Sequence, residues 1–566
     1  MSNPDPASVR RYLAADADLG DAAVVESSFR ELETRRVESK DALEQWLLDW
    51  SELDSWLDEE GSQRYVNMTC HTDDAALEKR YLDFIESVEP LSRSWEHKLD
   101  KKLLASVHRS DLPNDRYGIL WRQVEARTAI FREENIPLHT EDDKLRQQYQ
   151  KLIGGMTLQH DGREQTMQQM GRYLEGTERA VRQEAGEKIA AKWAESREEI
   201  ERIYDEMIRV RHRIGLNAGF ASYRDFMFKE MQRFDYTPGD CEAFANSIAE
   251  IVVPAARQLA ETRKRQLGVD RLRPWDMQVD PEGRSPLAPF ESEAQLVAAA
   301  EKVFDKVNPL FGEQFRRMQR ERLLDLESRK GKAPGGYMNM FQGRRLPFIF
   351  MNAVGTQRDV ETLLHEGGHA FHSFAASAEP LLELREAPIE FSEVASMAME
   401  LLSLPWLNAF YSEQDHRRAQ ADHLDGIVRF FPYMATIDQL QHWVYAHPNH
   451  TREDRRIAWS ALVDRFGGWI DYTGYESARD FDWHRKQHPF TVPFYYVEYG
   501  IAQLGALGVW LNSQRDYARA VQQYRSGLAL GGTKPLPRLF EAAGVKFDFS
   551  ARAIEPITRE MMRRIA

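Results

Sequence analysis

The sequence predicts a mainly α protein with one small β-sheet. Along the first 270 residues, apolar side chains recur every three or four positions among Glu, Lys, Arg and Gln, which is the spacing of amphipathic helices. Glycine and proline are sparse in this region, and it lacks the β-branched runs that are typical of a large sheet. The clearest helical patterns cover residues 30–56 and 177–216.

The only convincing strand pattern lies in the middle of the chain. Turn-forming residues punctuate 272–289 and 332–336. Two short apolar segments follow, at 337–341 and 346–352, and the residues Gln-Gly-Arg-Arg separate them. This arrangement predicts a β-hairpin. From Thr356 onward the helical pattern returns and continues to the end of the chain.

Length and composition set the broad class. The 566 residues exceed one ordinary domain, and we expect an N-terminal helical lobe at 1–200 and a catalytic region at 201–566. A content of 42% apolar and 29% charged residues is typical of a globular protein in water. No pattern indicates an oligomeric state.

Charge and cysteine content exclude several classes of protein. A net charge of −15 opposes general binding to nucleic acid or to an anionic membrane. The sequence shows neither an 18-residue apolar run nor a secretion signal. Its two cysteines, Cys70 and Cys241, form no Cys-x-x-Cys motif, which excludes a thiolate zinc site of that kind. We therefore expect a cytoplasmic protein that binds neither nucleic acid nor membrane.

The strongest chemical signal lies on a predicted helix over residues 357–375. Thr356 and Asp359 have the spacing of a capping box at its start. His365 and His369 are four apart, about one helical turn, so both rings can reach one tetrahedral metal ion. Glu366 then faces the open position of the metal, where it can take a proton from water.

The facing of this helix supports the metal interpretation over a solvated surface that carries His and Glu by chance. Steps of about 100° per residue place the apolar side chains opposite the two histidines and Glu366. His372 projects on the polar side, either as a supporting hydrogen-bond donor or as a surface histidine. The metzincin pattern is excluded, because it needs Gly at 372 and His at 375, where the chain has His and Ala.

A catalytic zinc site needs a third protein ligand, and residues 385–402 offer four carboxylates. Ser392 is predicted to cap a helix on which Glu393 and Glu400 share one face, two turns apart. We expect Glu393 to be the ligand and Glu400 to support a histidine ligand through a hydrogen bond. Glu386 and Glu390 are interpreted as solvated loop charges.

With this ligand set, the sequence resembles the family of thimet oligopeptidase and oligoendopeptidase F, and it is more similar to the second branch. Three blocks carry the resemblance, at residues 362–372, 391–402 and 488–506. The resemblance implies a neurolysin-like zincin, in which two helical lobes enclose a deep channel with one Zn²⁺ per chain on its floor. It also implies short unstructured peptides as substrates, and a strand at 346–352 whose edge pairs with them.

The block at 488–506 also supplies donors for the oxyanion of a tetrahedral intermediate. In the related enzymes, a histidine and one or two tyrosines in this place face the substrate carbonyl. Here these are His488 with Tyr496 and Tyr499, and Tyr495 is the alternative. The competing interpretation is an aromatic core stripe at the start of a helix.

The predicted function is a zinc metalloendopeptidase that hydrolyses internal bonds of short peptides, with Glu366 as the general base. The first alternative is a zinc carboxypeptidase or dipeptidyl carboxypeptidase, with Arg385 or Arg485 holding the terminal carboxylate. The second is an inactive peptide-binding relative.

Overall fold

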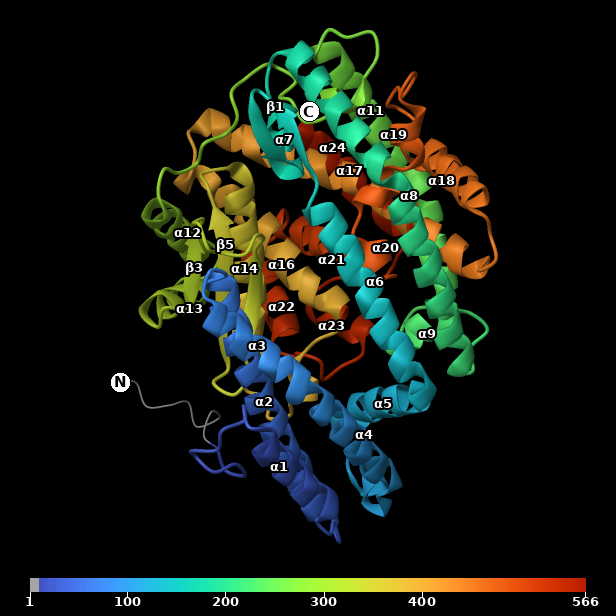
Figure 1. Cartoon of the computed structure of the whole chain (residues 1–566). Coiled ribbons are helices and arrows are strands. Elements are labelled where there is room, and N and C mark those ends of the chain that lie inside the picture. The colour runs from blue at the N-terminus through green and yellow to red at the C-terminus, as the bar shows by residue number, and fades with distance from the viewer. Residues whose placement is uncertain (1–9) are drawn as a thin grey trace. The chain divides into compact units, whose positions relative to one another are not determined.

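The computed structural model describes residues 10–566, and helices dominate them (Figure 1). This confirms the prediction of a mainly α protein. The described residues include no helix with the length and apolar content needed to cross a bilayer. They form two compact units, each assembled from three stretches of chain.

The first unit comprises the described residues up to 128, residues 288–418 and residues 502–547. Its elements are α1 Ala22–Thr34, α2 Lys40–Cys70, α3 Ala75–Ser87, α4 Glu89–Ala105, η2 Val107–Asp111, α12 Glu293–Val307, α13 Pro309–Arg320, β3 Leu324–Glu327, β4 Tyr337–Phe341, β5 Leu346–Ala353, α14 Gln357–Ala376, α15 Leu382–Arg385, α16 Ile389–Ser403, η6 Leu404–Ala409, α22 Tyr517–Leu528 and α23 Leu536–Ala542.

The second unit comprises residues 129–287, 419–501 and 548–566. Its elements are η3 Glu133–Asn135, α6 Ile136–Gly154, β1 Thr157–His160, β2 Arg163–Thr166, α7 Met167–Tyr173, α8 Arg179–Asn217, α9 Tyr223–Glu230, α10 Pro238–Ser247, η4 Ile248–Val252, α11 Val253–Gln266, η5 Pro274–Asp276, α18 Arg452–Gly467, α19 Glu476–Asp480, η7 Asp482–Arg485, α20 His488–Thr491 and α24 Ala551–Ile565. Three further helices have residues in both units: α5 Asn114–Ile130, α17 Glu413–Ala446 and α21 Tyr496–Ser513.

Because each unit draws on separated stretches, neither coincides with the continuous lobes expected at 1–200 and 201–566. That division into lobes stays a prediction, and so does the channel that the resemblance implies between them.

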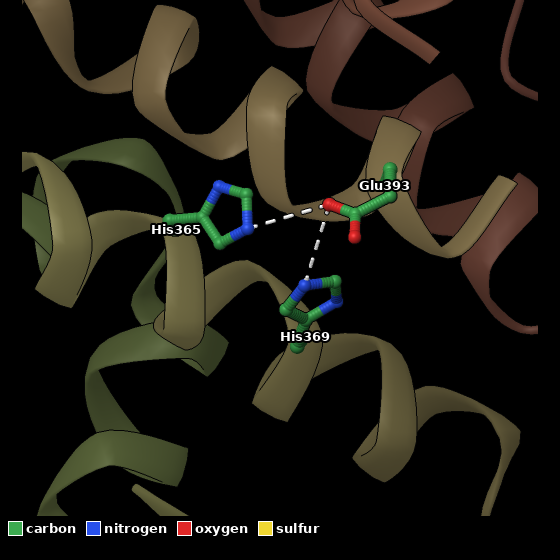
Figure 2. Close-up of side chains that lie close together, drawn as sticks. All are labelled: His365, His369 and Glu393. Carbon is green, nitrogen blue, oxygen red and sulfur yellow. Dashed lines mark ion pairs between the residues drawn. The ribbon is translucent and has the colours of Figure 1, made fainter. Parts of the chain in front are cut away.

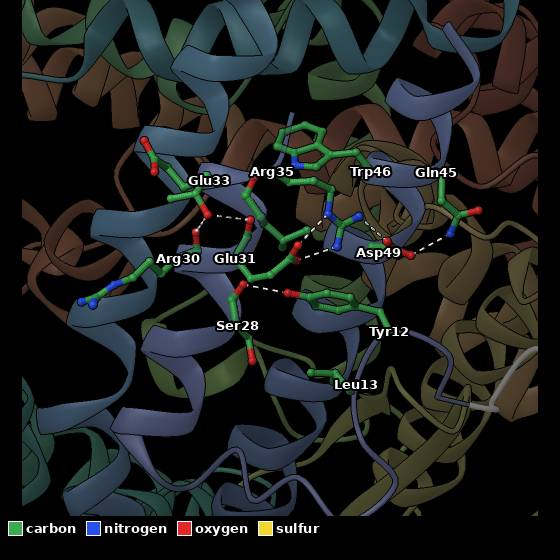
Figure 3. A network of polar contacts seen from close by, with 12 residues as sticks. Tyr12, Leu13, Ser28, Arg30, Glu31, Glu33, Arg35, Gln45, Trp46 and Asp49 are labelled. Atoms are coloured by element: carbon green, nitrogen blue, oxygen red, sulfur yellow. Dashed lines mark hydrogen bonds and ion pairs between the residues drawn. The ribbon is translucent and has the colours of Figure 1, made fainter. Parts of the chain in front are cut away.

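The helical pattern at 30–56 is divided between α1 and α2 (Figure 3). The ammonium group of Lys102 donates hydrogen bonds of 2.6–2.7 Å to the carbonyls of Leu32, Glu33 and Arg35, which end α1. The side chain of Ser39 then caps the start of α2. The hydrogen bonds of Lys102 end α1, and the Ser39 cap starts α2. A helical pattern that looks continuous in the sequence therefore forms two helices.

The three-stranded sheet of the first unit has the order β3-β5-β4. Strands β4 and β5 form the predicted antiparallel hairpin, and β3 adds to β5 in parallel. The expectation that β5 offers an edge to a substrate is wrong, because both of its edges are already paired. Strand β4 lies at the edge of this sheet.

The main chain of β4 alternates between its partner strand and the sheet edge. Met338 pairs with Ile349 and Met340 with Pro347. Ile349 donates its N–H to Leu323 on the β3 side at 3.0 Å, and Pro347 has no N–H to give. Both pairs are thus non-hydrogen-bonded positions, and the peptide groups of Met338 and Met340 point toward the free edge.

Three strands, β1, β2 and β3, escaped prediction. The β1–β2 hairpin turns at Asp161 and Gly162, which both have positive φ. The Asp-Gly pair is a strong hairpin signal, but its strands are too polar to show alternation. Strand β3 has four residues and depends on pairing with distant β5.

Helix α14 lies against β5 in the first unit (Figure 1). Its apolar face packs through Phe371, whose ring stacks on Phe311 and meets Phe304 edge-on. This packing fixes the rotation of α14 and turns the opposite face toward β4 and α16.

Candidate metal centre

The helix that carries the histidines begins and ends as predicted. Thr356 is the N-cap of α14, and the carboxylate of Asp359 accepts hydrogen bonds from the N–H of Thr356 at 2.8 Å and from its hydroxyl at 2.9 Å. From Gln357 the helix continues to Ala376 without interruption. His365 and His369 therefore project from one face of a regular helix, and their ring centroids lie 4.9 Å apart.

Helix α16 brings the third donor because α14 lets it approach closely. A Cβ at Gly368 would lie 2.5 Å from the carbonyl oxygen of Ala395 and 2.6 Å from Cα of Ser396. Only glycine permits this spacing without a backbone shift. Tyr524 of α22 donates a 2.6 Å hydrogen bond to the same Ala395 carbonyl.

Two expectations for this segment are wrong. Helix α16 begins at Ile389 after Pro388, so Ser392 lies inside its first turn and does not cap it. Glu390 is buried at 3% exposure, because the earlier helix start places it on the inner face and not in a solvated loop. Glu386 is exposed, and its carboxylate accepts a 2.7 Å hydrogen bond from Gln342.

The three predicted metal donors converge (Figure 2). Oε2 of Glu393 lies 3.3 Å from Nε2 of His365 and 3.6 Å from Nε2 of His369. One ligand atom from each residue falls within 4.8 Å of the others. Two imidazoles and a carboxylate are the donor types of a three-ligand catalytic zinc site, so the residues fit this metal.

Supporting hydrogen bonds orient two of these donors. Nδ1 of His365 lies 2.6 Å from Oε1 of Glu400, as the seven-residue spacing from Glu393 predicts. Ser396 donates a 2.9 Å hydrogen bond to Oε2 of Glu393. Ser396 was not predicted from the sequence, although its position three residues after Glu393 on a helix was the available signal.

The protonation of the donors follows from burial and from their neighbours. Burial lowers the pKa of His369 to about 4, which keeps this ring neutral. The pKa of Glu393 is lowered to about 2, because the neighbouring histidines outweigh burial. At His365, hydrogen bonds to Glu393 and Glu400 outweigh burial and raise the pKa, so a metal ion has to displace that proton.

Glu366 lies beside the metal donors and next to the edge strand β4. Its side chain is buried, and burial raises its pKa to about 7, assisted by the charge of Glu393. The backbone amide of Met338 on β4 opposes this shift by hydrogen bonding to the carboxylate. The contact between β4 and Glu366 gave no signal in the sequence, because it depends on the tertiary packing of the sheet edge.

Within the block at 488–506, residues 488–499 lie in the second unit and form an aromatic cluster. The ring of His488 lies 4.8 Å from that of Tyr496, 5.8 Å from Tyr499 and 6.0 Å from Tyr495. Tyr496 is buried and meets Phe430 edge-on, as a core residue does, whereas Tyr495 and Tyr499 are partly exposed.

This cluster is held by a buried cation. Arg211 of α8 donates hydrogen bonds to the carbonyls of Pro489 and Phe490 and to the carboxylate of Asp142. The metal donors belong to the first unit and His488 to the second. The roles of His488 and the tyrosines in one active site therefore stay predictions.

The two arginines considered for a terminal carboxylate also belong to different units. Arg385 lies in the first unit and lines one cavity with His369 and Glu393. Arg485 is exposed in the second unit. His372 lines the same cavity as Arg385, and its burial excludes the surface interpretation.

Comparison with known proteins finds oligopeptidases among those similar to this chain. The chromosomal oligoendopeptidase F of Lactococcus lactis subsp. cremoris is 26% identical over 257 residues, 44% of this chain and 41% of that protein. The group B oligopeptidase PepB of Streptococcus agalactiae serotype III is 24% identical over 259 residues, with the same shares. The chain thus spans about two fifths of the length of these curated relatives.

A solved structure of PZ peptidase A with an inhibitor superposes with a TM-score of 0.89 at 26% identity, covering 98% of this chain and 99% of that one. Residues 20–131 match the peptidase M3 N-terminal domain. Residues 172–558 match peptidase family M3 itself, and this match includes every metal donor described above. The chain therefore belongs to peptidase family M3.

Proposed function

We propose that the protein is a zinc-dependent oligoendopeptidase that hydrolyses internal bonds of short unstructured peptides, with one Zn²⁺ per chain. The observation that carries this proposal is the convergence of His365, His369 and Glu393 beside a buried Glu366. Membership of peptidase family M3 supports the same reading.

The proposed mechanism assigns separate tasks to the residues of the centre. A zinc ion held by His365, His369 and Glu393 supplies Lewis acidity and a water of lowered pKa. Glu366, whose own pKa is raised to about 7, accepts the proton of the attacking water and delivers it to the leaving amine. Glu400 keeps His365 in the tautomer that leaves Nε2 free for the metal.

Strand β4 supports the binding of an extended peptide. The peptide groups of Met338 and Met340 point to the sheet edge, and the amide of Met338 meets Glu366. A substrate that adds as a further strand here brings its main chain to the proposed base. The main chain of a folded protein is already hydrogen-bonded, so this mode of binding favours unstructured peptides.

We assign stabilisation of the oxyanion to His488 with Tyr499, Tyr496 or Tyr495, as the resemblance implies. Nδ1 of His488 is buried and has no hydrogen-bond partner among the described residues. Burial, assisted by Lys486, lowers the pKa of His488 to about 4, so its ring is a neutral donor at neutral pH. The partial exposure of Tyr495 and Tyr499 suits substrate contact better than the buried Tyr496.

The experiment that tests this function is a digest of a defined peptide mixture with and without a chelator. The proposal expects internal cleavage of short peptides, loss of cleavage on chelation and recovery with zinc. Cleavage that persists in the chelator, or a complete lack of cleavage by the zinc-loaded protein, contradicts it.

A carboxypeptidase remains the second candidate, because Arg385 lines a cavity together with two metal donors. Peptides with an amidated C-terminus separate the two functions. An endopeptidase cleaves the amidated peptides at the same internal bonds. An enzyme that must bind the terminal carboxylate no longer cleaves them. The location in the cytoplasm and the absence of nucleic-acid and membrane partners remain part of the proposal.

A further inference from the structure

A cavity of about 330 Å³ opens beside the metal centre within the first unit. Two of the metal donors, His369 and Glu393, line it on one side. Met338 and Met340 of the edge strand β4 line it on another. The cavity thus lies next to the place where the proposed function puts the scissile bond.

His372 lines this cavity and has an unsatisfied ring nitrogen. Its side chain is 6% exposed, and its Nε2 has no hydrogen-bond partner among the described residues. The ring meets Phe391 edge-on at 5.9 Å, which fixes its plane. Burial lowers its pKa to about 3, so the imidazole is neutral at neutral pH and carries one N–H.

Arg385 lines the same cavity, and its Nε–H has no hydrogen-bond partner among the described residues. Its Nη1 donates to the backbone and side-chain oxygens of Gln342 at 3.0 and 3.1 Å, and its Nη2 to Oγ of Ser55 at 2.7 Å. Its Nε–H is buried and has no partner among residues 10–566. These three hydrogen bonds fix the guanidinium in place, while its Nε–H stays unpaired.

The backbone around Arg385 is held as firmly as its side chain. Gly532 donates its N–H to the carbonyl of Leu384 at 2.9 Å. A Cβ at Gly532 would lie only 2.1 Å from the carbonyl oxygen of Glu386. This close approach fixes the direction in which Arg385 enters the cavity.

The buried Arg385 Nε–H and His372 Nε2 both lack partners, and a ligand oxygen satisfies both when His372 carries its proton on Nε2. A buried donor left unsatisfied costs about 1–3 kcal/mol, and an oxygen atom of a ligand recovers that cost. Glu386, the remaining carboxylate of the lining beside Glu393, already accepts from Gln342. An apolar side chain in this cavity leaves both nitrogen atoms unpaired.

We infer that this cavity is a substrate side-chain subsite that selects glutamate or glutamine at a residue flanking the scissile bond, and that Arg385 Nε–H and His372 Nε2 recognise the side-chain oxygen. The inference rests on the proposed function. Side chains of a peptide paired with β4 alternate between the two faces of the sheet, so one flanking residue points to the metal side, where the cavity lies.

The direct test uses the zinc-loaded wild-type protein and peptides blocked at both ends. The peptides differ only at one of the two residues flanking the cleaved bond, which is Gln, Glu or the similarly sized Met. At one of these positions, we expect kcat/KM to be about tenfold higher for Gln or Glu than for Met. Equal or better cleavage of the Met peptides at both positions overturns the subsite.

Variants identify the groups that cause the preference. Arg385→Lys keeps the charge but removes Nε–H, and His372→Phe keeps the ring that packs on Phe391. Each variant is expected to reduce the ratio of kcat/KM for the Gln peptide to kcat/KM for the Met peptide to less than about threefold. The control Arg316→Lys on α13 leaves this ratio unchanged. A ratio that stays at the wild-type value in both folded variants overturns the assignment. If either variant fails to fold by circular dichroism, the wild-type series decides.

Further outcomes of these experiments distinguish a failure of the subsite from a failure of the proposed function. If the preference needs a free C-terminal carboxylate and vanishes in amidated peptides, the donors bind the chain end and the side-chain assignment is wrong. Cleavage without any preference overturns the subsite alone. A protein that cleaves no peptide at all overturns the proposed function and the subsite together.

Discussion

Nδ1 of His365 lies 2.6 Å from Oε1 of Glu400, two turns along α16 from the donor Glu393. One helix thus supplies a metal donor and the group that orients another donor. Rotation of either helix would break the contacts of Glu393 and Glu400 with His365. The metal centre therefore depends on the packing of α14 against α16.

The contact between Glu400 and His365 gives the first prediction. Glu400→Gln retains the shape of the side chain but loses the negative charge on the acceptor. We expect zinc affinity to fall by about 10–100-fold, which is the usual cost of losing such a partner. Competitive titration with a zinc-binding dye measures the affinity, and the exposed Glu555→Gln is the control. An unchanged affinity contradicts the role of Glu400.

The close approach of α14 and α16 gives the second prediction. Gly368→Ala places a methyl group against the backbone of Ala395, so the helices must separate. We expect the free energy of unfolding to fall by about 1–3 kcal/mol and zinc affinity to fall with it. Urea denaturation measures the first quantity and dye titration the second.

The matched control for this substitution is Gly426→Ala on α17. A Cβ there meets no atom within 4 Å, and alanine favours the helix. The account expects this variant to be at least as stable as the wild type. Equal stability of the variants Gly368→Ala and Gly426→Ala would show that the helices tolerate a wider spacing.

A half-buried carboxyl on α2 gives a prediction for pH. Burial raises the pKa of Asp54 well above its usual value, assisted by the charges of Glu96 and Glu383. Between about pH 4, where an unfolded Asp titrates, and the raised folded pKa, the folded state binds more protons than the unfolded state. Its stability therefore falls as pH rises through this window.

Asp54→Asn removes this titration and should stabilise the protein by about 1 kcal/mol at pH 8, with less effect at pH 5. Urea denaturation at both pH values measures the difference. A variant that is less stable than the wild type at pH 8 contradicts the assignment of the raised pKa.

Local patterns predict much of the centre. The capping pair Thr356 and Asp359 marks the start of α14, and the helical period puts His365 and His369 on its polar face. The seven-residue step from Glu393 to Glu400 places both on one side of α16. Each of these features depends on residues within two or three helical turns, which the sequence displays directly.

Features that depend on distant packing were missed. Strand β3 exists through its pairing with β5, and that pairing changes β5 from an edge strand to a central one. The burial of Glu390 follows from the start of α16 after Pro388, and not from the charge of the residue. The two units combine stretches hundreds of residues apart, and no periodicity reveals this.

The central claim is that Glu366 is the general base of a zinc peptidase, and Glu366→Gln tests it most directly. Zinc content and turnover of a quenched peptide are measured on the same sample of the variant. The account predicts one zinc ion per chain, as in the wild type, with turnover reduced by about 10²-fold or more. A variant that holds zinc and cleaves the peptide at near wild-type rate would contradict it.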